Sequence, residues 1–231
     1  MVERYAKYPI SDTAGTQLLA LVLASLFATM GVLQLGIAVL FPVAIIPAMV
    51  GIGVIARVLT ESAVGEKTPP AIEQASTLVG AGLRGTTVVA ASAIIPVLTL
   101  LGGQRVLLAL GTTGGSDGGI LLFVVSVTIL SVVAFFAYLA PIAIAHVGES
   151  TSARQTFDSR ISTIASRTEY LVAWGSSGIA LLGVGGLIAL MRANGGPIGD
   201  LLGIAILGYA ILAWAHAVGW AIGIAKRRSN S

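Results

Sequence analysis

"QLLALVLASLFATMGVLQLGIAVLFPVAIIPAMVGIGVIA", residues 17–56, is the stretch that decides the fold, because it contains no Asp, Glu, Lys or Arg. As a single α-helix, these residues would be about 60 Å long. The hydrocarbon core of a bilayer is about 30 Å thick, and about 20 apolar residues cross it. The stretch therefore predicts two membrane spans, joined by a short external turn between Gln34 and Pro42.

Four more uncharged stretches follow, each of which suits one span, at 85–104, 118–148, 170–191 and 201–225. Only 10% of the residues are charged, against about 25% in an ordinary soluble domain. This leaves too little polar surface to cover a soluble helical core. We expect an all-α fold with six transmembrane helices in a single integral membrane domain, residues 1–231. The predicted spans are approximately 17–36, 42–59, 85–102, 119–145, 170–191 and 201–225.

The basic residues predict the orientation of these spans. Eleven of the 13 fall on one side of the six-span map: Arg4, Lys7, Arg57, Lys67, Arg84, Arg154, Arg160, Arg167, Lys226, Arg227 and Arg228. Only Arg105 and Arg192 fall on the other side. Because positively charged loops stay in the cytoplasm, we expect a multi-pass protein of the cell membrane with both termini cytoplasmic. The first apolar run exceeds a signal-peptide core, and we expect it to act as an uncleaved anchor.

The two long cytoplasmic junctions differ in character from the spans. In residues 64–85, Thr68 and Pro69 have the residue types of a helix start, which predicts a short surface helix that bends into the third span. In residues 149–170, Phe157, Ile161 and Ile164 share one helical face, with basic residues elsewhere. That pattern is typical of a helix lying in the membrane interface. We therefore expect two amphipathic cytoplasmic interfacial helices.

The segment "VGIGVIARVLTESAVGEKTPP", residues 50–70, resembles the signature of an archaeal integral membrane family, known mostly from halophiles, called domain of unknown function 4013. The positions that carry the resemblance are Pro47, Gly51, Arg57, Gly65 and the pair Pro69–Pro70. The resemblance extends over most of the chain. It implies a type of membrane fold and no activity.

Two further patterns concern helix packing. Ala20, Ala24 and Ala28 in the first span, and Ala215, Gly219 and Gly223 in the last, recur every four residues. Such small-residue faces let two helices approach closely in lipid, either within the chain or in a homo-oligomer or a complex with a membrane-protein partner; chance in a chain rich in Ala and Gly is the alternative. Spans 2–3 and 4–5 also have similar spacings, which fits either a weak internal repeat or two unrelated hairpins.

Few residues are candidates for chemistry. The chain has no cysteine, which excludes disulfides and thiolate metal sites. We find no catalytic motif around His146 or His216, and we expect no enzyme activity, metal or cofactor. The candidate binding feature is an intramembrane stripe of Tyr209, His216 and Trp220, which share a face of the sixth span. His216 either bonds a Ser, Thr or Tyr of span 4 or 5 and fixes the packing, or lines a solute path.

Because no motif indicates a function, the functional prediction depends on where the polar segments lie relative to the membrane. The polar segments and bases gather on the cytoplasmic side, which favours a structural or accessory membrane protein whose cytoplasmic face contacts lipid or a partner. The alternative is a transporter or channel for a small neutral solute. The bases lie at span ends, so the pI near 9.5 does not indicate nucleic-acid binding. The expected partner is the lipid bilayer.

Overall fold

The computed structural model describes residues 7–34, 41–71, 75–111, 118–149 and 159–229. These residues contain helices and no strand, which confirms the all-helical prediction. The elements are η1 (Tyr8–Ile10), α2 (Thr13–Gln34), α3 (Phe41–Val64), α4 (Ala75–Gly111), α5 (Gly118–Glu149), α6 (Ser159–Ala165) and α7 (Thr168–Ser229). Within the described ranges, five helices are long and apolar enough to cross a membrane: α2, α3, α4, α5 and α7.

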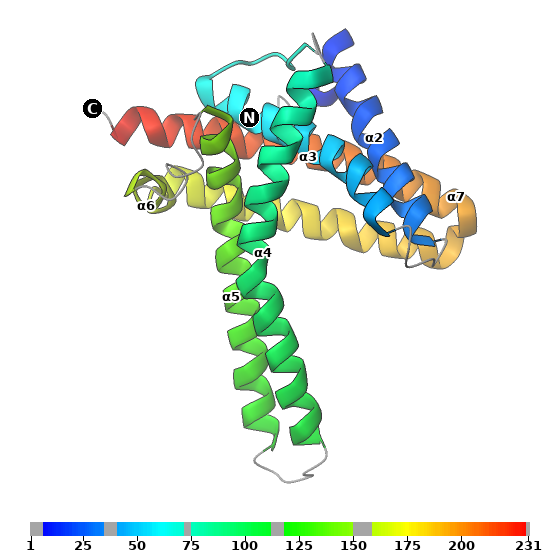
Figure 1. Ribbon diagram of the computed structural model, residues 1–231, viewed down its shortest axis with the longest axis vertical. Helices are drawn as coiled ribbons and strands as arrows, with labels where there is room; N and C mark the ends of the chain where they lie inside the picture. The colour runs from blue at the N-terminus through cyan, green and yellow to red at the C-terminus, as the bar shows by residue number, and fades with distance from the viewer. Residues whose placement is uncertain (1–6, 35–40, 72–74, 112–117, 150–158, 230–231) are drawn as a thin grey trace.

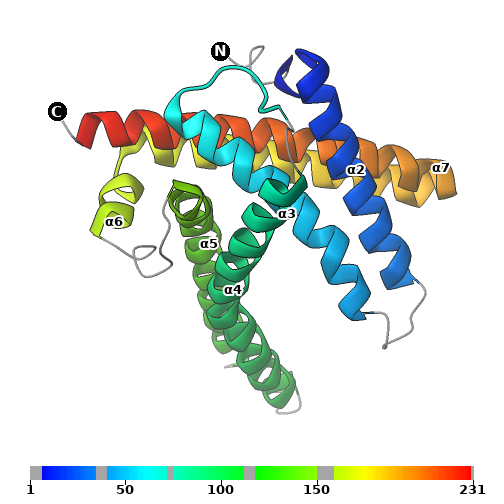
Figure 2. The ribbon, with the colours of Figure 1, turned by 45° about the horizontal axis from the view of Figure 1, so that its top comes forward.

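Helix α7 is a hairpin of two arms rather than one straight rod. Gly196 has φ 53° and ψ −140°, a left-handed backbone that glycine adopts without steric cost, and Pro197 follows it. The chain reverses there, and the two arms run side by side (Figures 1 and 2). A Cβ added to Gly203 on the second arm would lie 2.9 Å from Cγ2 of Ile188 on the first, so the arms touch. The fifth and sixth predicted stretches correspond to these arms.

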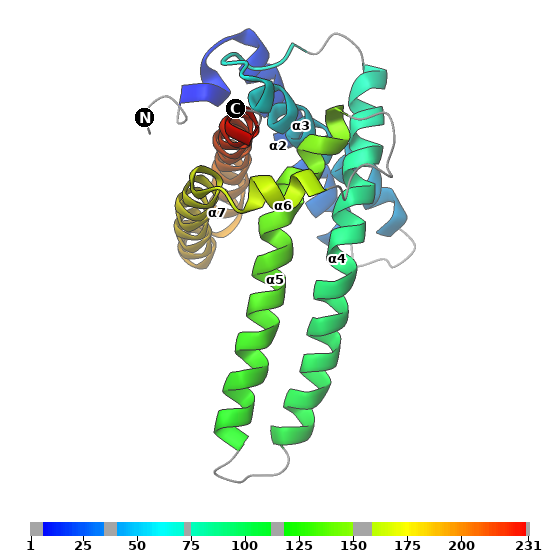
Figure 3. The ribbon, with the colours of Figure 1, turned by 90° about the vertical axis from the view of Figure 1, so that its left-hand side faces the viewer.

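The helices spread out from one end of the molecule, which we call the convergent end. It brings together η1, the α3–α4 linker (residues 65–71), the start of α7 and the end of α7. Pro69 of the linker and Pro9 of η1 both lie against Gly15 of α2, and Gly65 lies near the Arg227 guanidinium. From this end the α4–α5 hairpin projects away from the other helices, at a steep inclination to the arms of α7 (Figures 1 and 3).

Helix α3 is the centre of the fold and contacts α2, α4, α5 and α7. Its contact with α7 depends on the small residues of the second arm, where Ala215, Gly219 and Gly223 are buried. A Cβ on Gly219 would lie 2.6 Å from the Leu59 carbonyl oxygen, and one on Gly223 would meet the Ala63 carbonyl. Close packing through this predicted face is confirmed.

The small residues of α2 behave differently. Ala20, Ala24 and Ala28 are exposed, whereas Leu18 and Val22 of the same helix are buried. This alanine face therefore packs against none of the described helices. A contact with another copy or with a membrane-protein partner stays a prediction.

The start of the first predicted surface helix is wrong, although its later residues are helical from Ala75 and continue into the third span as predicted. Residues 65–71 are not helical, and no helix begins at Thr68 or Pro69. Gly65 has φ 109°, a conformation that ends α3, and Pro69 and Pro70 are buried. Helix α4 then runs without a break from Ala75 through the predicted start of the third span. The polar-looking linker is a coil packed into the convergent end rather than a helix lying on a membrane.

The second predicted surface helix is only partly right. Helix α6 exists, and its residues Ile161 and Ile164 are 8% and 3% exposed, so the apolar face was assigned correctly. However, α6 contacts α5 and α7, and the Tyr138 hydroxyl donates a hydrogen bond to the Ala165 carbonyl. Protein therefore covers this face where we expected lipid. Phe157 lies outside the described residues. Because α6 has no counterpart in residues 65–71, the internal repeat gains no support.

Candidate functional site

A deeply buried polar contact joins α3 to α7. Ser62 and His216 are 1% and 3% exposed, and Oγ of Ser62 lies 2.8 Å from Nδ1 of His216. The glycine one turn further along α7 makes this contact geometrically accessible. A Cβ on Gly219 would lie 2.9 Å from Cβ of Ser62, and its absence lets the two helices come close enough for a serine to reach the imidazole.

The third member of this cluster comes from the N-terminal segment. The ring of Tyr8 stacks on the ring of His216, with centroids 3.7 Å apart and planes inclined by 8°. Tyr8 is 3% exposed, and its burial raises the pKa of the phenol, which therefore stays neutral. Ser62 is near the phenol oxygen but does not form a well-aligned hydrogen bond with it. We call Tyr8, Ser62 and His216 the stacked cluster.

Local sequence explains how Tyr8 is held. Pro9 occupies the first turn of η1, where a missing N–H is harmless, and it is buried. The Ser11 hydroxyl donates a hydrogen bond to the Tyr8 carbonyl at 3.0 Å, which closes the 3-10 turn. Oδ1 of Asp12 accepts a bond of 2.7 Å from the Gly15 N–H and caps α2. The tyrosine is thus fixed between a tight turn and a capped helix.

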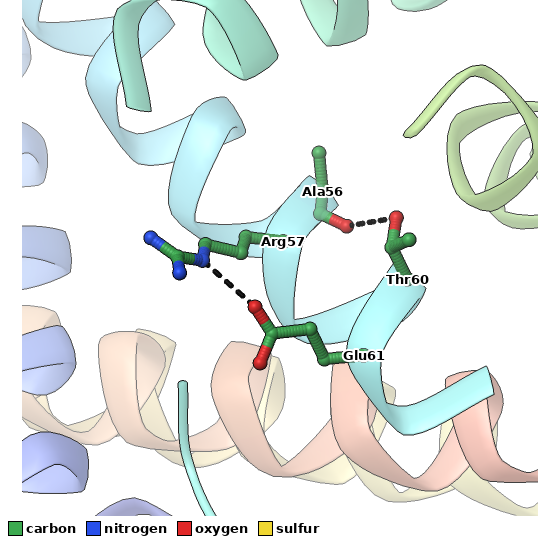
Figure 4. A network of polar contacts seen from close by, with 4 residues as sticks. All are labelled: Ala56, Arg57, Thr60 and Glu61. Atoms are coloured by element: carbon green, nitrogen blue, oxygen red, sulfur yellow. Dashed lines mark hydrogen bonds and ion pairs between the residues drawn. The ribbon is translucent and has the colours of Figure 1, made fainter. Parts of the chain in front are cut away.

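Ion pairs also lie on the helices that carry Ser62 and His216. Figure 4 shows the pair on α3, where Nε of Arg57 donates to a carboxylate oxygen of Glu61 at 2.8 Å. In the same view the Thr60 hydroxyl donates to the Ala56 carbonyl at 2.8 Å. These side chains are partly exposed, and one terminal nitrogen of Arg57 is buried without a hydrogen-bond partner. A second pair, Arg228 with Glu169, fastens the end of α7 to its start.

The chemistry open to this arrangement is limited by its burial. A hydroxyl beside an imidazole has the composition of a nucleophile and its base. Here all three side chains are at most 3% exposed, and the phenol ring covers one face of the imidazole. A substrate does not reach them in this conformation. Among the described residues, no group of three or more His, Cys, Asp or Glu could hold a metal ion.

The three residues of the predicted stripe differ in burial. They lie on the second arm of α7, but His216 is buried while Tyr209 and Trp220 are half-buried. His216 does face another helix and bond a serine, as one of the two interpretations required. The expected partner was wrong, because the serine belongs to α3 rather than to span 4 or 5. His146 lies apart, near the end of α5, and is half-buried.

Comparison with known protein families gives a match. Residues 36–193, more than half of the chain, match the family described as "Protein of unknown function (DUF4013)". The chain belongs to the DUF4013 family. No curated protein and no solved structure matches this DUF4013 protein.

The matched region of this DUF4013 protein covers only one residue of the stacked cluster. It includes Ser62 but neither Tyr8 nor His216, which lie in the flanking parts of the chain. Sequence reasoning missed both Tyr8 and Ser62. Span 2 was expected to end near residue 59, which put Ser62 in a loop, whereas α3 continues to Val64. The sequence carries one signal for the tight turn around Tyr8, which is the proline that follows it.

Proposed function

We propose that this DUF4013 protein is a multi-pass protein of the cell membrane that acts as a structural or accessory component. In this proposal the six predicted spans are α2, α3, α4, α5 and the two arms of α7, with both termini in the cytoplasm. The convergent end is the cytoplasmic face, and it contacts anionic lipid headgroups or a partner. The origin of the chain in a halophilic archaeon stays a prediction.

The observation that carries the proposal is the grouping of bases at the convergent end. Lys7, Lys67, Arg227 and Arg228 are exposed there, on three segments that are far apart in the sequence. Pro9 and Pro69 pack closely against Gly15, and Gly65 lies near the Arg227 guanidinium, so these segments lie together. A base near an anionic membrane surface contributes about 1 kcal/mol to its attraction. Several such bases at one level of the molecule form a collar suited to lipid phosphates.

Burial supports a structural role over the alternatives. The stacked cluster is closed by Tyr8, so its polar groups stabilise a helix contact instead of lining an open passage. This favours an accessory protein over a transporter or channel for a small neutral solute. The same burial is our reason for proposing no enzyme activity, because a catalytic serine must meet its substrate.

The lipid contact is tested by the lipids that stay bound when the protein is extracted in polymer-bounded nanodiscs from a mixed anionic and neutral membrane. Lys67→Gln with Arg227→Gln should lower the anionic share of retained lipid. The matched control is Arg105→Gln with Arg192→Gln, which removes two bases from the opposite ends of the helices. Equal effects of the two double variants would show that only total charge matters, and would overturn the proposed collar.

The orientation is tested by thiol labelling, because the chain has no native cysteine. Asn194→Cys, next to the reversal of α7, should react with a membrane-impermeant maleimide added to intact cells. Ser229→Cys, at the end of α7, should react only after the membrane is opened. Labelling of Ser229→Cys in intact cells would contradict cytoplasmic termini.

A further inference from the structure

Arg57 is a base within an apolar helix segment. The apolar segment of α3 is Val43–Val64, and Arg57 precedes its end by about seven residues, or about 10 Å. The polar layer of one leaflet is about 5–8 Å thick. A helix that ends at the bilayer surface therefore has Arg57 near the boundary between headgroups and acyl chains. A base at this depth is costly unless an acceptor meets it, and such residues mark functional sites.

Protein engages only part of the Arg57 guanidinium. Its Nε donates to a carboxylate oxygen of Glu61 at 2.8 Å. In Figure 4 the two terminal nitrogens lie on the far side of the guanidinium from Glu61. The terminal nitrogen Nη1 is buried, and none of the described residues accepts a hydrogen bond from it. The edge formed by the terminal nitrogens presents two N–H groups at the spacing of two phosphate oxygens.

The Arg57 side chain leaves α3 between two neighbouring helices. Gly51 of α3 packs against α2, and Gly53 packs against α4. At about 100° per residue, position 57 points between these two directions, about 40° from that of Gly53. The side chains of Arg57 and Glu61 are 23% and 32% exposed. A molecule in the surrounding membrane can therefore reach the guanidinium between α2 and α4.

We propose that Arg57 binds the phosphate of an anionic phospholipid between α2 and α4, and that Glu61 is a positioning residue that orients the guanidinium. Because Glu61 occupies Nε, the edge of the terminal nitrogens is left for two phosphate oxygens. The phosphodiester of a lipid lies where headgroups meet acyl chains, which is the depth of Arg57. The inference rests on the membrane insertion and anionic-lipid contact proposed above, and names a specific site for that contact.

The ligand is tested by thermal unfolding in dodecyl maltoside, a detergent without phosphate, with dihexanoyl phosphatidylglycerol added. A ligand that binds only the folded protein raises the unfolding midpoint, and the concentration dependence gives its affinity. We expect a saturable rise, and a smaller one with dihexanoyl phosphatidylcholine, because its choline cation offsets the phosphate charge. An equal rise with inorganic phosphate would show a site for free phosphate and would overturn the lipid assignment.

The residues are tested by Arg57→Gln with Glu61→Gln, which removes the ion pair without changing the net charge. This double variant should weaken the affinity for phosphatidylglycerol about ten- to a hundredfold, because it loses charge-assisted hydrogen bonds. Arg57→Lys keeps the charge but lacks the planar fork, and should weaken the affinity about tenfold.

The matched control is Arg192→Gln with Asp200→Asn, which also leaves the net charge unchanged. Nε of Arg192 lies 2.7 Å from a carboxylate oxygen of Asp200, so the control removes an ion pair of the same kind at the turn of α7. It should leave the affinity for phosphatidylglycerol unchanged. Each variant is compared with its own midpoint without lipid, which separates a loss of binding from a loss of folding.

The site is overturned if phosphatidylglycerol gives no saturable rise in the parent, or if either Arg57 variant binds it as tightly as the parent does. The collar is judged separately. Lys67→Gln with Arg227→Gln should keep the saturable rise here, although it lowers the anionic share of lipid retained in nanodiscs. Failure at Arg57 therefore leaves the proposed function standing, and failure of the collar leaves this site standing.

Discussion

The hydrogen bond between Ser62 and His216 can be tested by a double-mutant cycle. Ser62→Ala leaves the buried Nδ1 of the imidazole without this partner, and an unsatisfied buried polar atom costs about 1–3 kcal/mol. His216→Phe keeps an aromatic ring to stack on Tyr8, whose centroid is 3.7 Å away. It should cost about 1 kcal/mol, because the freed serine hydroxyl can turn to a carbonyl of its own helix.

The double variant replaces both polar partners by apolar groups, and so neither is left unpaired. We therefore expect it to cost less than the sum of the single variants. Hydrogen bonds between membrane helices contribute about 0.6 kcal/mol on average and up to about 1.7 kcal/mol. The difference between the sum and the double variant should fall between about 0.5 and 1.7 kcal/mol.

The assay is unfolding by dodecyl sulfate in mild detergent micelles, followed by tryptophan fluorescence. The control cycle pairs His216→Phe with Ser176→Ala, because Ser176 is exposed and donates only to Ala173 in its own helix, at 3.3 Å. That cycle should be additive. If the Ser62 cycle is additive as well, the 2.8 Å contact contributes nothing to stability and the reasoning is refuted.

Three further variants test the packing. Tyr8→Phe keeps the stacked ring and should leave stability at neutral pH unchanged or higher. Because burial raises the pKa of the Tyr8 phenol, the parent protein loses stability from this group only as the pH rises above about 10. In a pH series of unfolding midpoints, Tyr8→Phe should therefore lose less stability than the parent. Gly223→Ala should lower the melting temperature, since its Cβ meets a backbone carbonyl, whereas Gly178→Ala, with open space around it, should leave it equal or higher. Ile161→Asp should reduce folded yield far more than Ser162→Asp, because only Ile161 is buried; equal yields would contradict the packing of α6.

The helices could be predicted from the spacing of charges because membrane insertion depends largely on one dimension, the length of an uncharged run. The reversal of α7 follows the same logic, since Gly196 and Pro197 interrupt an apolar stretch too long for one span. Close packing at Gly219 and Gly223 was predictable too, because a four-residue repeat puts small residues on one helix face. That periodicity does not say which helix occupies the face.

The stacked cluster could not be predicted for a related reason. A buried histidine needs a partner, but the choice among serines depends on how helices cross, and the sequence does not encode that locally. The prediction for the α3–α4 linker failed for a different reason. Thr68 and Pro69 have the residue types of a helix start, yet the positive φ of Gly65 turns the chain and tertiary packing of two prolines overrides the local signal.

The stacked cluster has a consequence for assembly. Ser62 and His216 are separated by 154 positions, and Tyr8 precedes every described membrane-length helix while His216 lies in the last. If the helices enter the bilayer in chain order, Tyr8 and Ser62 therefore lack their partner His216 until the second arm of α7 has inserted. In a protein that inserts in this order, the contact that closes the convergent end would form late. A chain interrupted between residues 193 and 216 would retain the matched family region and lack His216, the residue on which both Ser62 and Tyr8 pack.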